Sequence, residues 1–105
     1  QTEKKEHESK YNQVSFNFSS YLNKEKRLGF LQFDNLPNLP DNKCFQIWVS
    51  RNGIIENIGV LSKIDKQQLI QIPFKEKGII YITIEEKPGN PNPNPKESIA
   101  NIPIG

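Results

Sequence analysis

The residues best suited to chemistry in this chain are its single cysteine and its single histidine, Cys44 and His7. A cysteine nucleophile needs a nearby base that lowers the pKa of its thiol. His7 lies in a charged segment, far from Cys44 along the sequence. Blue-copper sites need two histidines beside the cysteine, and zinc sites need a comparable set of ligands. The sequence therefore predicts no thiol catalysis, no metal site and no cofactor.

Carboxylates are the next candidates, because glycoside hydrolysis needs two of them facing each other across a cleft. Glu85 and Glu86 are adjacent, so in a strand they point to opposite faces and do not form a pair. Asp34, Asp41 and Asp65 fall in predicted turns. No pair of acids is marked by its spacing, and we expect no catalytic residues and no enzyme activity.

Charge and glycine spacing argue against two further classes of site. The net charge is +2, and the densest basic cluster, Lys24, Lys26 and Arg27, has no interleaved aromatic residues of the kind that bind a phosphate backbone. The glycines are scattered, and no glycine-rich loop leads into a helix. We therefore expect neither a nucleic-acid partner nor a nucleotide site. No run of about 18 apolar residues is present to span a membrane.

The segment that holds the single tryptophan predicts a strand over residues 44–50. In a strand its side chains alternate, with Phe45, Ile47 and Val49 on one face and Cys44, Gln46, Trp48 and Ser50 on the other. The apolar face predicts the core. Trp48 then needs a partner for its indole N–H, and Gln46 is expected to bond backbone groups of the turn at residues 36–41. A ligand groove built on Trp48 is the alternative interpretation.

Elsewhere the sequence alternates short apolar segments with turn signals at intervals near ten residues, which predicts an all-β fold. An antiparallel β-sandwich of about seven strands, similar to immunoglobulin domains, is the favoured architecture, and a small β-barrel is the alternative. The charged segment 1–10 has no apolar period and predicts a disordered linker, so the folded domain is expected over 11–105. The predicted strands span residues 14–19, 28–33, 44–50, 54–61, 69–74, 79–86 and 99–104.

Two turns and one long loop are distinctive. Asn52-Gly53 is a strong hairpin signal, and Pro73 predicts a strand edge or a strand end. The loop at residues 87–98 is rich in asparagine and proline, so it should be extended and exposed, with polyproline II character. Because such segments lose little entropy on binding, the loop is also a candidate contact surface for a protein partner. Its candidate residues are Pro88, Gly89, Pro91, Pro93 and Pro95.

From residue 28 onward the chain resembles the C-terminal domain of the anti-sigma-K factor family. That family has a Leu-Pro-x-Leu-Pro turn, a Lys-aromatic-Gln-Leu-Trp strand, a glycine-containing turn, and a late strand followed by a Gly/Pro-rich loop. Two departures are that Glu86 and Lys87 separate Glu85 from Pro88, and that the loop contains Asn-Pro repeats. The matching residues are Leu36, Pro37, Leu39, Pro40, Lys43, Phe45, Gln46, Ile47, Trp48, Gly53, Gly59, Val60, Thr83, Ile84, Glu85, Pro88, Gly89, Pro95, Ile104 and Gly105.

The resemblance implies a single-pass inner-membrane protein whose cytoplasmic part binds an extracytoplasmic-function sigma factor. This domain would then be periplasmic or extracellular, segment 1–10 would be the juxtamembrane linker, and a periplasmic protease or another protein would be the partner. The missing methionine agrees with a fragment or a processed product. The sigma-binding residues of the family lie outside this sequence, so none is assigned here, and the expected roles of the matching residues are structural.

The alternative is a secreted or surface β-sandwich that binds a carbohydrate or a peptide. Its contacts would be exposed aromatic side chains such as Tyr11, Tyr21 or Trp48. A buried Trp48 favours the regulator, whereas an exposed aromatic patch favours the binding module.

Overall fold

The protein is an eight-stranded antiparallel structure in the part of the chain that the computed structural model describes, residues 2–11, 13–34, 36–61, 67–73, 77–92 and 98–104. None of these residues is helical, so none belongs to an apolar helix of membrane-spanning length. The strands are β1 (Thr2–Tyr11), β2 (Val14–Asn23), β3 (Leu28–Asp34), β4 (Lys43–Arg51), β5 (Ile54–Leu61), β6 (Gln67–Pro73), β7 (Gly78–Glu86) and β8 (Ser98–Ile104).

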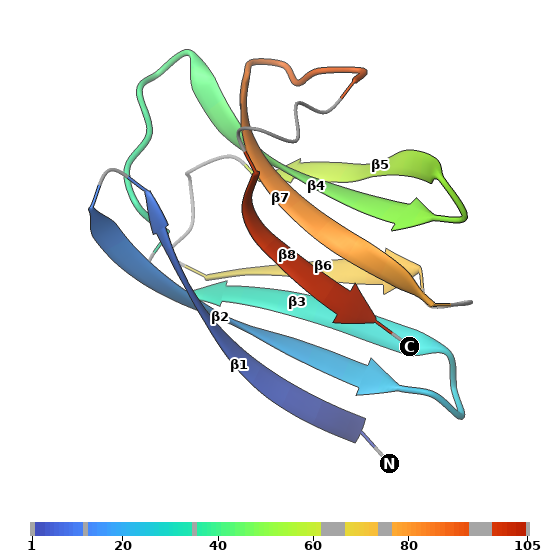
Figure 1. Ribbon diagram of the computed structural model, residues 1–105. Coiled ribbons are helices and arrows are strands. Elements are labelled where there is room, and N and C mark those ends of the chain that lie inside the picture. The colour runs from blue at the N-terminus through green and yellow to red at the C-terminus, as the bar shows by residue number, and fades with distance from the viewer. Residues whose placement is uncertain are drawn as a thin grey trace.

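The strands form two four-stranded sheets that pack face to face (Figure 1). Sheet A has the order β1-β2-β3-β6 and sheet B the order β5-β4-β7-β8. Each sheet has two edges, and the ladder does not close into a barrel. The predicted antiparallel β-sandwich is therefore confirmed, and the small-barrel alternative is wrong.

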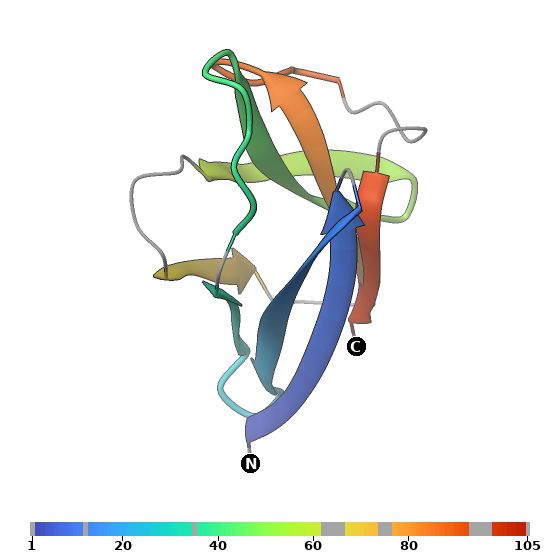
Figure 2. The ribbon, with the colours of Figure 1, turned by 90° about the vertical axis from the view of Figure 1, so that its left-hand side faces the viewer.

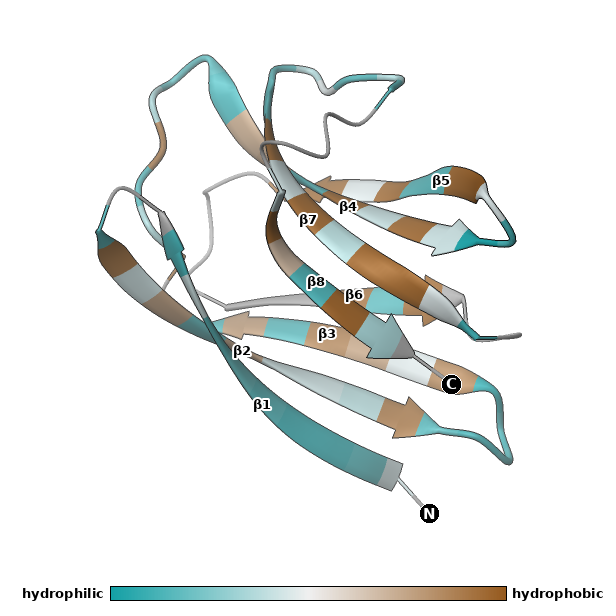
Figure 3. Cartoon of the chain, in the orientation of Figure 1, coloured by the Kyte–Doolittle hydropathy of each residue, from teal (hydrophilic) through white to brown (hydrophobic). Residues whose placement is uncertain are grey.

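The core lies between the sheets and is built from alternate residues of the central strands, with single residues from the edge strands β5, β6 and β8 (Figure 3). Period-two alternation turns one side chain in two toward the facing sheet, which explains why strands with this pattern pack as layers. Phe18 and Phe33 stack with ring centroids 5.2 Å apart. The predicted core face of residues 44–50 is confirmed. The buried core residues are Phe16, Phe18, Leu22, Leu31, Phe33, Phe45, Ile47, Val49, Leu61, Ile72, Ile80, Ile82 and Ile102.

The N-terminal segment differs from the prediction. Residues 2–11 form β1, which pairs with β2 over the whole register from Thr2↔Asn23 to Tyr11↔Val14. The prediction of a disordered linker over 1–10 is therefore wrong for residues 2–10. An edge strand needs no apolar side chains to form a backbone ladder, which is why its hydropathy pattern did not reveal it. With β1 included, the described residues form eight strands, where about seven were predicted.

Strand β1 is held by a few polar contacts as well as by its ladder. The hydroxyl of Ser9 donates to the carbonyl of Ile99, which joins β1 to β8 at one side of the sandwich (Figure 2). His7 stacks on Phe18, with centroids 4.9 Å apart, and its Nε2 lies 2.9 Å from the hydroxyl of Ser20. Through these contacts the polar strand β1 packs against Phe18, one of the aromatic residues of the core.

The turns predicted at Asp41 and at Asn52-Gly53 are confirmed, whereas Asp34, also predicted in a turn, is the last residue of β3. Asn52 and Gly53 have φ values of 49° and 77°, so the hairpin between β4 and β5 has the positive-φ pair that this dipeptide favours. Pro73 ends β6, an edge strand of sheet A. Gly59 lies in β5 beside a bulge, where the register with β4 shifts. Asp65, the third acid predicted in a turn, lies outside the described residues.

Candidate functional site

The residues singled out from the sequence gather at two places in the fold. One is the face of sheet B that points away from sheet A, where the loop after β7 folds back; we call Gln46, Trp48, Thr83, Glu85, Gly89 and Asn90 the outer-face cluster. The other is a crevice beneath the β3–β4 connection, which contains the two Leu-Pro pairs. Two further motif residues, Gly53 and Gly59, lie in the β4–β5 hairpin and belong to neither place.

Pairing between β4 and β7 positions the outer-face cluster. Gln46 lies opposite Thr83, and Cys44 lies opposite Glu85. Since side chains directly opposite in a ladder share a face, two segments nearly forty residues apart in the sequence supply one polar surface. Both strands are central in sheet B, which fixes this surface rigidly.

Gln46 binds the loop by two hydrogen bonds to the backbone of Asn90. Its Nε2 donates to the Asn90 carbonyl at 3.1 Å, and its Oε1 accepts from the Asn90 N–H at 2.9 Å. A primary amide that pairs with both backbone groups of one residue mimics a strand neighbour. Gln46 therefore fastens the 87–92 loop to sheet B. The prediction that it bonds the 36–41 turn is wrong, because that turn lies at the crevice.

Trp48 is a buried part of the same face and is only 1% exposed. Its indole N–H donates to the hydroxyl of Thr83 at 2.9 Å, which supplies the partner that a buried indole needs. Trp48 consequently does not form the floor of an open ligand groove. The predicted structural role is the one that its surroundings support.

Glu85 is a buried carboxylate beside Asn90. Its Oε1 accepts from the Asn90 side-chain amide at 3.2 Å, whereas its Oε2 has no hydrogen-bond partner among the described residues. Across the ladder, burial raises the pKa of the Cys44 thiol, and the negative charge of Glu85 raises it further. A raised pKa keeps the thiol protonated near neutral pH and makes it a poor nucleophile.

The conformation of the loop after β7 requires a glycine at position 89. Gly89 has a φ of 128°, a conformation that side chains rarely adopt, and an added Cβ would lie 3.3 Å from both Gln46 Oε1 and Val60 Cγ2. Pro88 and Pro91 are exposed, as predicted for a contact loop, while Gly89 is half-buried against the sheet. Pro93 and Pro95 lie outside the described residues.

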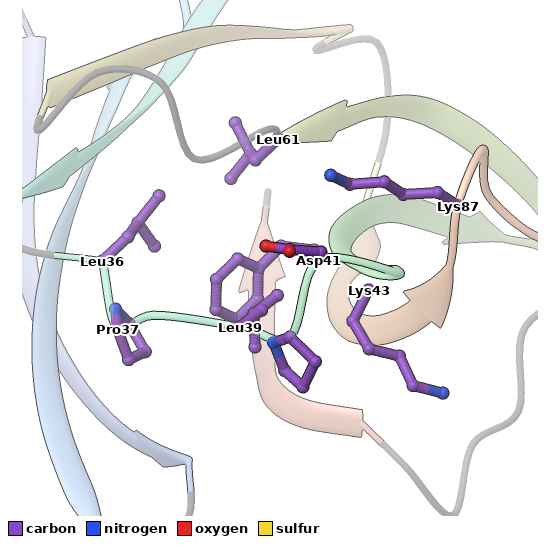
Figure 4. A pocket seen from close by; sticks show the side chains of 9 residues that line it. Leu36, Pro37, Leu39, Asp41, Lys43, Leu61 and Lys87 are labelled. Carbon is purple, nitrogen blue, oxygen red and sulfur yellow. The ribbon is translucent and has the colours of Figure 1, made fainter.

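The crevice has an apolar lining and a charged rim (Figure 4). Leu36, Pro37, Leu39 and Pro40 lie along the β3–β4 connection and close it over Phe45 and Leu61. Its volume is about 40 Å³, which is room for one or two water molecules and not for a metabolite. The two Leu-Pro pairs therefore cap one end of the core. The rim residues are Asp41, Lys43 and Lys87.

The groups considered for catalysis are spread through the fold. Cys44 is buried in sheet B, whereas His7 lies on β1 in sheet A and contacts Phe18 and Ser20. Within the described ranges, no three side chains of histidine, cysteine, aspartate or glutamate come together as metal ligands do. The arrangement of the site is that of a hydrogen-bonded structural network.

Asn90 is the residue of this network that sequence reasoning missed. Besides its contacts to Gln46 and Glu85, its side-chain oxygen accepts from the Asn92 N–H at 3.0 Å. The signal was present, since asparagine before proline is a common turn former that bonds the backbone two residues on. It was hidden by the repeats, which make Asn90, Asn92 and Asn94 look equivalent.

Comparisons with known proteins add no relative: no family model, no curated protein and no solved structure matches this chain.

Proposed function

We propose that this chain is the extracytoplasmic domain of a membrane-bound anti-sigma factor and that its role is regulatory and non-catalytic. The observation that supports the proposal best is the outer-face cluster. Gln46, Trp48, Thr83, Glu85 and Gly89, which carry much of the resemblance, come from three separate segments and meet in one buried network.

This convergence matters because motif residues scattered over the fold would point to a chance match. Gln46 fastens the loop after β7 to sheet B, and the hydroxyl of Thr83 accepts the hydrogen bond of the Trp48 indole. Gly89 permits the close approach of the loop to Gln46. Each motif residue therefore has a physical task in the same substructure. A network of this kind specifies the shape of a loop without exposing reactive groups.

In the proposed mechanism, the domain controls access of a periplasmic protease to the segment that follows the membrane. Proteases cleave extended, unpaired chain, and β1 is paired with β2 along its length. Residues 2–11 are therefore shielded while the sandwich is intact. Cleavage of the parent protein, and with it release of the bound sigma factor, would require β1 to leave sheet A.

The binding-module alternative named Tyr11, Tyr21 and Trp48, and it receives less support from Tyr21 and Trp48; the side chain of Tyr11 lies outside what the structure describes. Trp48 is buried, and the Tyr21 hydroxyl donates to Gln32 Oε1 at 3.1 Å while Lys4 lies over its ring at 5.6 Å from the centroid. Both rings are engaged within the protein. The exposed loop residues Pro88 and Pro91 remain available to a protein partner.

The test uses the parent protein in its native cell. We expect an apolar segment of roughly 20 residues before Gln1 and co-purification of a sigma factor with the part that precedes it. A Trp48→Ala substitution, which disrupts the cluster, should raise transcription from the sigma-dependent promoter through cleavage of the parent protein.

The matched control is Ile54→Ala, a truncation at an exposed position of the β4–β5 hairpin, which should leave transcription at the wild-type level. A cleavable signal peptide directly before Gln1, with no sigma factor bound, would refute the proposal and favour the secreted binding module.

A further inference from the structure

The turn between β2 and β3 concentrates the positive charge of the molecule. Lys24, Lys26 and Arg27 stand against one acid, Glu25, so the turn has a net charge of +2. The whole chain has the same net charge of +2, which means that the rest of the chain is neutral in sum. All four side chains of the turn are exposed. This local charge is therefore open to a partner of opposite sign.

The backbone of this turn is ordered, while its cations are unpaired. The Lys26 N–H donates to Asn23 Oδ1 at 3.0 Å, and the Arg27 N–H donates to the Lys24 carbonyl at 3.4 Å. Among the described residues, no carboxylate forms an ion pair with Lys24, Lys26 or Arg27. A turn that is already ordered loses little backbone entropy when its side chains bind a partner.

The turn lies beside the start of β1 (Figure 1, Figure 2). Thr2 pairs with Asn23, the last residue of β2, and Asn23 Nδ2 donates to the Thr2 hydroxyl at 3.3 Å. Lys24 follows Asn23 directly, and it lines a shallow surface hollow together with Thr2. The basic turn is therefore within about one screening length, roughly 10 Å at 0.1 M salt, of the point where the chain enters the sandwich.

In the function proposed above, the membrane segment precedes residue 1, so this end of the sandwich faces the lipid headgroups. An anionic membrane attracts each Lys or Arg near its surface by about fivefold in affinity, and the attraction falls off within a screening length. Leu28 is 37% exposed, follows the turn and pairs with Asn23. It adds an apolar side chain to the cations, the combination that binds at membrane interfaces.

We propose that the β2–β3 turn and Leu28 form a membrane contact that binds anionic phospholipid headgroups, an inference that rests on the proposed function. A membrane surface needs no aromatic stacking between the cations, whereas a nucleic-acid strand does. The acids at this end, Glu3 and Glu25, line the hollow beside the turn and reduce the attraction without reversing it. The contact holds the start of β1 against the membrane and so limits access of a protease to the connection.

The test is co-sedimentation of the full 105-residue chain with lipid vesicles at about 0.1 M salt. Vesicles of equal parts phosphatidylglycerol and phosphatidylcholine are compared with vesicles of phosphatidylcholine alone. We expect the partition coefficient to be at least about tenfold higher on the anionic vesicles. Lys24→Gln combined with Lys26→Gln should lower it at least about tenfold, and Leu28→Ser should lower it about threefold.

The matched control is Lys10→Gln combined with Lys87→Gln, which also removes two exposed lysines. Lys10 is about 26 Å along β1 from Thr2, and Lys87 follows the far end of β7, so this pair should keep the wild-type partition coefficient. Circular dichroism checks that the variants fold.

Equal binding of the wild type to both kinds of vesicle, or an equal loss in the two lysine pairs, would overturn the membrane contact. Because the binding is measured without the parent protein, such a result leaves the proposed function standing wherever a sigma factor co-purifies with the parent. Anionic binding that the first lysine pair alone removes supports the contact.

Discussion

Strands β1 and β7 have the same extended backbone and similar lengths, but different interactions stabilise them. β7 is central in sheet B, and Ile80 and Ile82 are completely buried between the sheets. β1 lies at the edge of sheet A, and among its side chains at residues 2–10 one is buried, Ser9, and one is half-buried, His7. Hydrophobic burial anchors β7, whereas a backbone ladder and a few polar contacts anchor β1.

This difference predicts that the two strands open separately. Segments with few buried apolar contacts unfold locally at a lower free energy than the core does. β1 should therefore detach from β2 while β4 and β7 remain folded. Such local opening is what the proposed protease control requires, and the substitutions below test each side of the comparison.

The largest expected effect is that of Trp48→Ala on the β4–β7 side. Removing a fully buried aromatic side chain lowers the free energy of unfolding by about 3–5 kcal/mol, and it also leaves the Thr83 hydroxyl without its donor. The measurement is a urea unfolding curve followed by far-ultraviolet circular dichroism.

Trp48→Phe is the matched control, since it retains a buried ring and loses only the bond to Thr83. It should cost clearly less than Trp48→Ala. If both variants unfold at the wild-type midpoint, Trp48 does not contribute to the stability of sheet B and the comparison with β1 fails.

A smaller effect is expected from Gln46→Ala, which removes both hydrogen bonds to the Asn90 backbone. Leaving such groups without partners costs about 2–3 kcal/mol. Hydrogen exchange should also show faster exchange of the Asn90 N–H than in the wild type. This change tests whether the loop adds to the stability of sheet B.

Glu85→Gln is the contrasting variant in the same cluster. Glutamine keeps an acceptor for the Asn90 amide and replaces the unpartnered Oε2 by a donor group, so the free energy of unfolding should change by less than about 1 kcal/mol. A loss as large as that of Gln46→Ala would mean that the charge of Glu85 is itself stabilising.

The fold was predictable because its central strands carry a strong period-two signal. Phe45, Ile47 and Val49 alternate with polar or outward residues, and burial in one core explains this pattern directly. The Asn52-Gly53 hairpin was predictable for a local reason, the positive φ values that these residues tolerate. Both features depend on side chains close together in the sequence.

The rest depended on partners that sequence periodicity does not identify. β1 forms because β2 offers it a ladder, and no alternation of apolar residues marks it. The partner of Gln46 is Asn90, 44 residues away, and only the antiparallel register of β4 and β7 brings the loop to it. Trp48 was placed on the correct face, but the hydroxyl that receives its indole N–H could not be named from the sequence alone.

The smallest expected effect concerns His7 and the stability of β1. Burial lowers the pKa of His7 below its ordinary value of 6.5, and the positive charge of Lys5 lowers it further. The folded strand therefore favours the neutral ring, while the opened strand binds a proton near the ordinary pKa. The contribution of His7 is fully present above that value and decreases as the pH falls below about 6.5.

Hydrogen exchange at pH 7.5 and pH 5 measures this change, with protection of β1 amides compared to that of β7 amides. Protection of β1 should fall at pH 5, and protection of β7 should not. His7→Phe keeps a ring that can stack on Phe18 and removes the titration, so its β1 should lose this pH dependence. If β1 of His7→Phe loosens at pH 5 as much as the wild type does, protonation of the β1 carboxylates accounts for the effect and His7 does not. In that outcome β1 is still the weaker strand, but the stack of His7 on Phe18 is not what sets its stability.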